Sequence, residues 1–564
     1  MNKIWLQHYP QGIPAEVNVA QYRSLKEILE VSCQRFAALP AFTNMGTSIT
    51  YAELDRLTRQ FGAFLQQQLG LAKGARVAIM MPNLLQYPVA LFGALRAGMT
   101  IVNVNPLYTA RELRHQLRDS GAEAIVVLEN FAHTLQEILP ETAVKHVITT
   151  QVGDLLPWLK SLLVNFVVKR VKRMVPEWRI SAALDFRAAL ELGSQQRLQD
   201  VPLGPEDIAF LQYTGGTTGI AKGAILTHGN MVANLQQTSA WMSRVLQEGV
   251  ETIVTPLPLY HIFSLTANCL TFMKWGANNL LITNPRDIPG FIKELKRTRF
   301  TAITGVNTLY NALLNHAGLS EVDASGLKVA VGGGMAVQRS VAQRWKEAMG
   351  IALIEGYGLT ETSPIVCANP LDAKEFSGAV GLPLPSTDVS IRNDKGEELG
   401  VGDVGEICVR GPQVMKGYWN LPEETAKTMD KDGWLRTGDM GMMDERGYVR
   451  ITDRKKDLVI VSGFNVYPNE IEDVIAMHPG VLESAVIGVP DERSGEAVKV
   501  IVVRKDPALT EKALIEHCRK YLTGYKVPKH VEFRTEPLPK TPIGKVLRRV
   551  LRDEELARLG QGKA

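Results

Sequence analysis

The chain has 564 residues, with 63 lysines and arginines against 59 aspartates and glutamates and a formal net charge of +4. This length exceeds what one hydrophobic core supports, so at least two domains are expected. The nearly balanced charge gives no basis for nucleic-acid binding, and 45% hydrophobic with 22% charged residues excludes a disordered or fibrous chain.

Cysteine usage and the amino terminus indicate a compartment. The five cysteines lie far apart, with no Cys-x-x-Cys pair and no cluster at zinc-ligand spacing, so free thiols in a reducing environment are expected. The first residues, MNKIWLQHYPQGIPAEV, lack the apolar run of a signal peptide, and no stretch reaches the roughly 18 to 20 apolar residues of a membrane span. A cytoplasmic location is the expectation.

The first half of the chain alternates short apolar runs with amphipathic patterns. Between Gly74 and Glu129 the runs ARVAIMM, TIVNV and EAIVVL are separated by the helical patterns LLQYPVALFGALRAG and ARELRHQLRDSG. This β-α-β-α-β order predicts a largely parallel sheet covered by helices, and it recurs between residues 300 and 358. The expected fold class is therefore α/β, with a large amino-terminal body.

An apolar and basic segment, LLPWLKSLLVNFVVKRVKRMVPEW, runs from Leu155 to Trp178. It is too short to span a bilayer, and its apolar part ends in four cations: Lys169, Arg170, Lys172 and Arg173. Such a segment suits the headgroup region of an anionic membrane. A core helix with a solvated basic end has the same pattern. Contact with the inner face of the cytoplasmic membrane is therefore one of two open interpretations.

The pattern changes after about Gly381, where STDVSIRNDKGEELGVGDVGEICVRG has short apolar runs separated by turns. This predicts a small antiparallel β unit attached to the body. The charged run DRKKD, Asp453 to Asp457, then precedes a block with its own strand and helix signals. We expect a linker here, between a body of residues 1–455 and a small, mobile α+β domain of residues 456–564.

A glycine and threonine loop, YTGGTTGIAKGA, is the first motif with chemical content. Its backbone N–H groups, hydroxyls and single lysine are the donors that a polyphosphate needs. It is not a Walker A loop, because the Gly-x-x-x-x-Gly-Lys-Ser/Thr spacing is absent. An ordinary surface turn is the alternative, and the density of donors favours phosphate binding. The candidate phosphate-binding residues are Tyr213, Thr214, Gly215, Gly216, Thr217, Thr218, Gly219 and Lys222.

Three further motifs follow. EGYGLTETS comes directly after a predicted strand and offers the ring of Tyr357, the hydroxyl of Thr360 and the carboxylate of Glu361, which could hold Mg²⁺ beside phosphates. GWLRTGD places Asp439 in a turn where it can accept ribose hydroxyls, and PKTPIGKVLRR holds Lys545 beside a turn. Each is weak alone, because helix-terminal carboxylates, Gly-Asp turns and surface lysines are common.

In this order and at these separations, the four motifs resemble the adenylate-forming superfamily of acyl-CoA synthetases, luciferases and peptide-synthetase adenylation domains. The resemblance covers nearly the whole chain, and DGWLRTGDMGMMDERGYVRITDRK and VSGFNVYPNEIEDVIAMHPGV are similar to the bacterial long-chain fatty-acyl-CoA synthetases in particular. It implies two steps in one site. A fatty carboxylate attacks the α-phosphorus of ATP, giving an acyl-adenylate and pyrophosphate, and the thiol of coenzyme A then attacks the acyl carbon and releases AMP.

The resemblance also implies roles for single residues. Around the nucleotide, Mg²⁺ would be held by Thr217 and Glu361, adenine would lie among Gly333, Gly334 and Tyr357, and the ribose would be held by Asp439 and Arg454. Lys545 would bridge the fatty carboxylate and the α-phosphate in the first step.

A rotation of the carboxy-terminal domain between the steps is implied as well. Lys456 would be its hinge, and the motion would withdraw Lys545 and bring Gly463 to the pantetheine tunnel. His261 would lie near the acyl entrance, although a packed structural histidine fits equally. Thr308 and Leu309 are candidates for the wall of the alkyl tunnel.

Two residues of the phosphate loop depart from the family pattern. Gly215 stands where many relatives carry Ser or Thr, and Ala221 where they carry Pro; both make the phosphate loop more flexible.

Two rival functions stay open. An aryl- or medium-chain acyl-CoA ligase is the first rival. The second is a catalytically silent, nucleotide-binding protein of the membrane surface. The joint presence of four residues disfavours it: Glu361, Asp439, Arg454 and Lys545.

Overall fold

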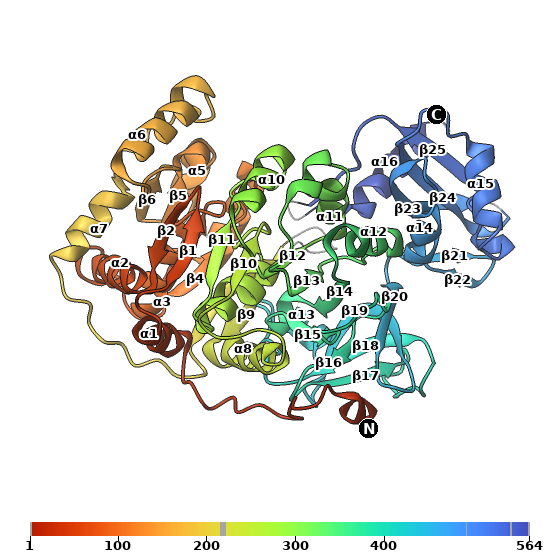
Figure 1. Ribbon diagram of the computed structural model, residues 1–564, viewed down its shortest axis with the longest axis horizontal. Coiled ribbons are helices and arrows are strands. Elements are labelled where there is room, and N and C mark those ends of the chain that lie inside the picture. Colours follow the sequence, from red (N-terminus) through yellow and green to blue (C-terminus); the bar gives the residue numbers. More distant parts are fainter. Residues whose placement is uncertain (1–2, 215–220, 492, 542–543, 562–564) are drawn as a thin grey trace.

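The computed structural model describes residues 3–214, 221–491, 493–541 and 544–561 (Figure 1). The phosphate-loop residues Gly215, Gly216, Thr217, Thr218 and Gly219 therefore lie outside the described residues. A seven-stranded sheet forms the first half of the body, and all its strands are parallel except the last. Its order is β7 (Ala183–Asp185), β6 (His146–Thr150), β5 (Ala124–Leu128), β3 (Arg76–Met80), β4 (Thr100–Asn103), β8 (Ile208–Thr214) and β9 (Lys222–Thr227).

A nine-stranded sheet forms the second half of the body. Its centre is parallel and its two ends are antiparallel. Its order is β16 (Leu382–Pro383), β15 (Ile365–Ala368), β14 (Leu353–Gly358), β13 (Val329–Gly332), β12 (Ala302–Gly305), β10 (Thr252–Thr255), β11 (Asn278–Leu281), β1 (Pro40–Asn44) and β2 (Thr47–Thr50). The predicted α/β class is confirmed. The three strands expected between residues 74 and 129 lie within two residues of their predicted positions, and strands and helices also alternate between residues 300 and 358.

The helices of the body cover these sheets with amphipathic faces. In α4, for example, a capping box joins Thr109 and Glu112, and Leu113 and Leu117 are buried against the sheet. The helices are α1 (Leu25–Arg35), α2 (Tyr51–Ala63), α3 (Gln86–Arg96), α4 (Ala110–Ser120), α5 (Ala132–Ile138), α6 (Trp158–Phe166), α7 (Phe186–Ser194), α8 (His228–Met242), α9 (Thr271–Lys274), α10 (Ile288–Arg297), α11 (Asn307–Leu314), α12 (Arg339–Met349) and α13 (Pro422–Thr428).

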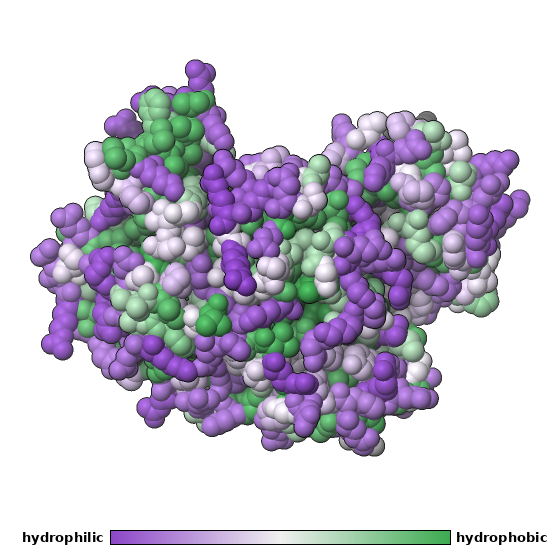
Figure 2. Space-filling view, in the orientation of Figure 1, coloured by the Kyte–Doolittle hydropathy of each residue, from purple (hydrophilic) through white to green (hydrophobic). Residues whose placement is uncertain are grey.

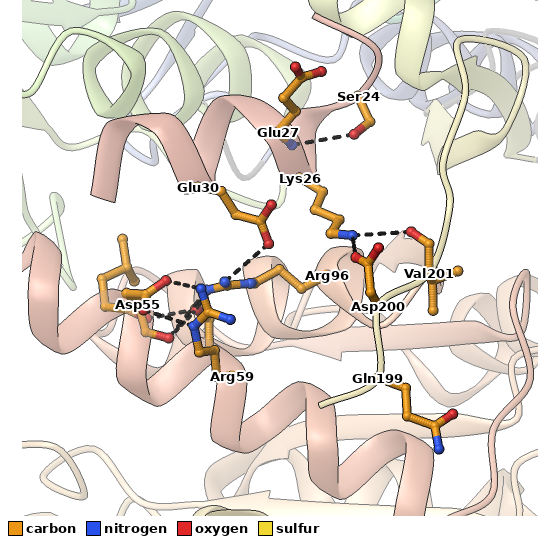
Figure 3. A network of polar contacts seen from close by, with 12 residues as sticks. Ser24, Lys26, Glu27, Glu30, Asp55, Arg59, Arg96, Gln199, Asp200 and Val201 are labelled. Atoms are coloured by element: carbon orange, nitrogen blue, oxygen red, sulfur yellow. Dashed lines mark hydrogen bonds and ion pairs between the residues drawn. The ribbon is translucent and has the colours of Figure 1, made fainter. Parts of the chain in front are cut away.

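A buried arginine ties the first three helices together (Figure 3). Arg96, at the end of α3, is fully buried; its guanidinium donates to Asp55 of α2 at 2.7 Å and to Glu30 of α1 at 3.1 Å. Lys26 of α1 pairs with Asp200 close by. A buried guanidinium is tolerated only with such partners, so this network fixes the packing of α1, α2 and α3 rather than forming a site.

The rest of the chain forms two smaller sheets. β17 (Asp388–Arg392), β18 (Gly405–Arg410), β19 (Leu435–Met443) and β20 (Val449–Arg454) make the antiparallel unit that the turn sequences predict. After Arg454 the chain enters a separate sheet with its own core, which we call the carboxy-terminal unit, Val459–Gln561. It contains β21 (Val459–Val461), β22 (Phe464–Val466), β23 (Val481–Asp491), β24 (Gly495–Arg504), β25 (His530–Arg534), α14 (Pro468–Ala476), α15 (Glu511–Arg519) and α16 (Arg548–Gln561).

Helix α6 has an unusual orientation, with its polar side chains turned inward and its apolar ones outward. Ser161 is buried and accepts from Arg187, and Asn165 accepts the backbone N–H of Gly153. Five large apolar side chains of α6 are instead 58–68% exposed: Trp158, Leu159, Leu162, Leu163 and Phe166. They form the green patch over α6 in Figure 2.

This orientation excludes the core-helix interpretation of the segment Leu155 to Trp178. α6 is not a core helix, because its large apolar side chains are mostly exposed. One of the four cations is not free, since Lys169 pairs with the buried carboxylate of Glu129 at 3.2 Å. Arg170, Lys172 and Arg173 are exposed. Among the described residues, no helix combines the length and apolar character that crossing a membrane requires.

Candidate active site

The predicted motifs meet at one cavity of about 1180 Å³. It lies where the carboxyl ends of β8, β13 and β14 come together, and strands of the small sheet and the carboxy-terminal unit complete its wall. Twelve of the predicted residues line it: Tyr213, Thr214, Lys222, His261, Gly333, Gly334, Tyr357, Thr360, Glu361, Arg454, Lys456 and Lys545. Gly463 does not.

One group of side chains is already joined by hydrogen bonds. Tyr357, at the end of β14, donates its hydroxyl to Asp439 at 2.7 Å, and Asp439 pairs with Arg454 at 3.1 Å. Asp439 and Arg454 face each other on β19 and β20, so the register of this hairpin makes the ion pair. Burial and the nearby Asp439 charge raise the pKa of Tyr357 well above its usual value, so the phenol stays a hydrogen donor.

Two glycines open the neighbouring wall. A Cβ atom on Gly333 would lie 3.0 Å from the ring of Phe263, and Gly334 has a φ of +76°, which side-chain-bearing residues rarely adopt. Both follow β13 directly, facing Tyr357 across the carboxyl edge of the sheet. The wall thus leaves a slot beside an aromatic ring, which suits a flat heterocycle.

Three residues that the motifs did not identify bond to the phosphate side of the cavity, and one of them, Tyr418, also lines it. Tyr213 donates to Asp119 at 2.5 Å, Lys222 pairs with Glu424 at 2.5 Å, and Tyr418 donates to Glu361 at 2.7 Å. Asp119, Tyr418 and Glu424 come from segments far away in the chain, and only the glycine-aromatic run KGYW before α13 hinted at a close approach there. Lys222 and Glu361 are therefore held in place by neighbours before any ligand binds.

The donors fit a magnesium ion carried by phosphates better than a metal cage built from protein. Within the described part of the chain, no three His, Cys, Asp or Glu side chains gather in a metal-binding group. Mg²⁺ usually binds one or two protein oxygens together with substrate phosphates and water. Glu361 lines the cavity and would supply one such oxygen; Thr217, the second predicted ligand, lies outside the described residues.

Lys545 reaches the cavity from the carboxy-terminal unit, beside a turn that we call the lysine turn. The N–H of Thr541 donates to the Lys545 carbonyl at 2.7 Å, and the Thr308 hydroxyl of α11 donates to the Gly544 carbonyl at 3.2 Å. Burial, together with the nearby Arg454 charge, lowers the pKa of Lys545 to about 7. Burial likewise lowers the pKa of His261 to about 4, with Lys545 adding to the effect, so His261 is neutral at pH 7.

An apolar arm extends from this polar chamber towards the amino-terminal ends of the strands. On β13 and its continuation, Val329, Val331 and Gly333 alternate onto the same face, so the arm follows the strand for roughly 13 Å. Its walls come from α8, α9 and the edges of β10 and β12, and the lining residues include Trp241, Met242, Leu246, Ile253, Phe272 and Ala302.

The structure corrects the predicted walls of this arm. His261, Ile262 and Ala267 line the cavity, as expected for the segment after His261. Thr308 and Leu309 do not line it, because Thr308 contacts the lysine turn and Leu309 packs into the core behind the sheet. Gly463 lies at the exposed tip of the β21–β22 hairpin with open space around it. Its role at a pantetheine tunnel stays a prediction.

Comparison with known proteins agrees with this geometry. Residues 29–419 match the family model described as AMP-binding enzyme, and residues 470–545 match the model of its C-terminal domain. The chain belongs to the AMP-binding enzyme family. It is 59% identical over 554 residues to the long-chain-fatty-acid–CoA ligase of Escherichia coli O157:H7, covering 98% of each chain.

Solved structures of other family members share the whole fold. The anthranilate CoA ligase AuaEII in complex with anthranoyl-AMP superimposes with a TM-score of 0.85 at 26% identity, covering 96% of this chain and 100% of that one. ATP-bound MatB from Rhodopseudomonas palustris gives a TM-score of 0.80 at 30% identity, covering 94% and 99%. The fold of this AMP-binding enzyme is therefore one that holds ATP and an acyl-adenylate in related proteins.

Proposed function

We propose that this AMP-binding enzyme is a long-chain-fatty-acid CoA ligase, which forms an acyl-adenylate from a fatty acid and ATP and transfers the acyl group to coenzyme A. The observation that carries the proposal is the single cavity in which the nucleotide motifs and Lys545 open onto an apolar arm. Charged groups can hold ATP at one end, while the arm removes an alkyl chain from water. The ligase from Escherichia coli supports the same assignment.

In the first step the chain's own residues bring two anions together. Asp439 would accept the ribose hydroxyls, while Lys222 would leave Glu424 for the polyphosphate. Lys545 would lie between the fatty carboxylate and the α-phosphate, where its positive charge offsets the charge that grows as the carboxylate oxygen bonds to phosphorus and pyrophosphate leaves. Neutral His261 would border the carboxylate without adding a charge.

A magnesium ion bound with ATP would neutralise part of the triphosphate charge. Glu361 and Thr217 would hold it, and Tyr418 fixes the Glu361 carboxylate through its hydroxyl.

In the second step Lys545 is no longer needed, because the adenylate already has a good leaving group. We propose that the domain of residues 456–564 rotates about Lys456, withdraws the lysine turn and brings Gly463 to the thiol's path. The position of Gly463 on an exposed hairpin leaves it free to move in this way. Sulfur then attacks the acyl carbon and AMP leaves.

The substrate test uses graded fatty acids and aromatic acids in a pyrophosphate-release assay, with thioester formation as second readout. Acids of long chain length should be the best substrates. The substitution Leu246→Trp places a larger side chain in the wall of the arm and should shorten it. It should reduce activity on long acids at least tenfold more than on short ones. Activity on aromatic acids without activity on palmitate would instead establish the aryl-ligase alternative, and no adenylate from any acid would favour a silent nucleotide-binding protein.

We further propose that α6 docks the enzyme on the inner face of the cytoplasmic membrane. The helix is too short to cross, its apolar face points outward, and Arg170, Lys172 and Arg173 follow directly. Apolar burial at the headgroup boundary combined with attraction to anionic lipid is the usual basis of in-plane binding. Because the inward polar side chains of α6 are already bonded to the body, docking requires no refolding.

Vesicle flotation tests this docking. The wild-type protein should float with anionic vesicles, and neutralising Arg170, Lys172 and Arg173 to Gln should release most of it. A control with the same charge loss carries Gln at the exposed Lys293, Lys395 and Lys431, and should still float. Equal binding of both variants would contradict electrostatic docking through this segment, and Leu162→Ser with Leu163→Ser would then show whether the apolar face alone binds.

A further inference from the structure

Asp453 is a buried carboxylate that joins the two parts of the molecule. It is the residue before Arg454 on β20, and its side chain is completely buried. Its Oδ2 accepts the backbone N–H of Asn469 at 2.8 Å, and its Oδ1 receives the Arg548 guanidinium at 3.3 Å. Apart from the adjacent N–H of Arg454, these recorded partners belong to the carboxy-terminal unit.

Arg548 carries this contact towards the cavity. It begins α16, three residues after Lys545, and it is held within its own unit by Glu472 at 2.7 Å and by the Asn469 side-chain oxygen. Asp457, in the charged run, lies 3.6 Å from the same guanidinium. The base of the lysine turn is therefore clamped on one side by its own unit and on the other by the body of the enzyme.

Asp453 also completes the start of α14. Asn469 is the second residue of that helix, whose first backbone N–H groups have no partner within the helix. A carboxylate placed there satisfies one of them and complements the positive end of the helix dipole. The body thus supplies an N-terminal cap to a helix of the other unit, and this contact exists only while the two are joined as described.

We infer that Asp453 is a positioning residue for the first half-reaction, anchoring α14 and Arg548 to the body so that the lysine turn points into the cavity. This inference rests on the proposed role of Lys545 in forming the acyl-adenylate. Asp453 touches no reacting atom itself, and it acts through Arg548. When the domain rotates for the second step, these contacts break, so their loss should not harm that step.

The environment of Asp453 indicates that the contact is specific. Burial raises the pKa of Asp453 to about 6, and the Arg548 charge opposes that rise, so at neutral pH the buried carboxylate depends on its partners. Removing one partner of a buried pair leaves an uncompensated charge, which makes the arrangement sensitive to either residue. Other ion pairs of α14, such as Glu470 with Lys526 at 2.7 Å, stay within the carboxy-terminal unit.

The test separates the two half-reactions in the full-length enzyme. Asp453→Asn keeps the size of the side chain and removes its charge. The rate of acyl-adenylate formation from palmitate and ATP, measured as pyrophosphate release in a single turnover, should fall about tenfold or more. Thioester formation from supplied palmitoyl-adenylate and coenzyme A should stay within twofold of wild type. Glu470→Gln, a charge loss on the same helix, is the matched control and should change neither rate.

Each outcome decides the inference. Equal loss in both half-reactions would mean that Asp453 only supports folding, and unchanged rates in both would mean that it positions nothing; either result overturns the proposal. If Asp453→Asn does not fold by circular dichroism, Arg548→Lys carries the same test, because it keeps the charge and loses the fork geometry. Inactivity of the wild-type enzyme on every fatty acid would refute the proposed function instead, which is a distinguishable result.

Discussion

The nucleotide side of the cavity and the lysine turn are built in different ways. Asp439 and Arg454 come from paired strands of the small sheet, Tyr357 comes from the nine-stranded sheet, and Asp439 bonds to both of the others within the body. Lys545 comes from another unit, and its turn meets the body through the hydrogen bond from Thr308 and the Asp453 contacts behind it. We call the nucleotide side permanent, because it belongs to the body, and the lysine turn delivered, because the carboxy-terminal unit brings it to the cavity.

This difference explains how one cavity can serve two reactions. In the proposed mechanism, the permanent side would hold the part of the ligand that both steps share, namely the adenosine, and it should be needed throughout. The delivered side would supply a positive charge that only the first step uses. Substitutions on the two sides should therefore differ mainly in which half-reaction they slow, and less in how large the rate loss is.

The largest effect is expected for Lys545→Ala. The substitution removes an aimed cation from the first transition state, and losing such a group typically costs about 2.7–4 kcal/mol, or roughly 10²–10³-fold in rate. Adenylate formation should be nearly abolished. Thioester formation from supplied acyl-adenylate should survive. Rapid-quench measurement of each half-reaction checks this, and a similar loss in both would contradict a role confined to the first step.

Asp439→Asn should give the next largest effect, and it should reach both half-reactions. The change removes the charge that pairs with Arg454 at 3.1 Å, while the amide oxygen can still accept from Tyr357. Hydrogen bonds to charged groups are worth about 1.5–3 kcal/mol, so kcat/KM should fall roughly 10- to 100-fold for ATP and for supplied adenylate. Tyr357→Phe, which removes one hydrogen bond, is a milder comparison. A defect limited to the first step would break the proposed distinction.

The pH dependence of adenylation gives an intermediate test. Because burial lowers the pKa of Lys545 to about 7, the free enzyme loses this cation as the pH rises above neutrality. The value of kcat/KM for adenylate formation should then fall up to about tenfold per pH unit above pH 7. The second half-reaction should show no such fall. Lys545→Arg should be slower but flat over the same range, since a guanidinium stays protonated.

The sequence predicts features that depend on nearby residues better than contacts between distant segments. The strands around residues 74–129 and 300–358 follow from local apolar periodicity, and Tyr357, Glu361 and Asp439 sit in short motifs. These features depend on nearby residues, which a single sequence displays directly.

Contacts between distant segments could not be predicted in the same way. Tyr418 meets Glu361 and Asp119 meets Tyr213 across separations of 57 and 94 residues. Thr308 was a candidate for the alkyl wall by the family resemblance, yet it bonds to Gly544, 236 residues away. The inward polar face of α6 was equally hidden, because an apolar stripe has the same spacing whether it faces a core or solvent.

Thr308→Val should give the smallest effect and the finest test of the comparison. It removes the hydroxyl that donates to the Gly544 carbonyl and leaves α11 otherwise intact. One such bond is worth about 0.5–1.5 kcal/mol, so adenylate formation should slow roughly 2- to 10-fold while thioester formation stays unchanged. Thr308→Ser keeps the donor and should behave like wild type. If Thr308→Val instead changed the preference between short and long fatty acids, Thr308 would belong to the alkyl arm and the lysine turn would be held by Asp453 alone.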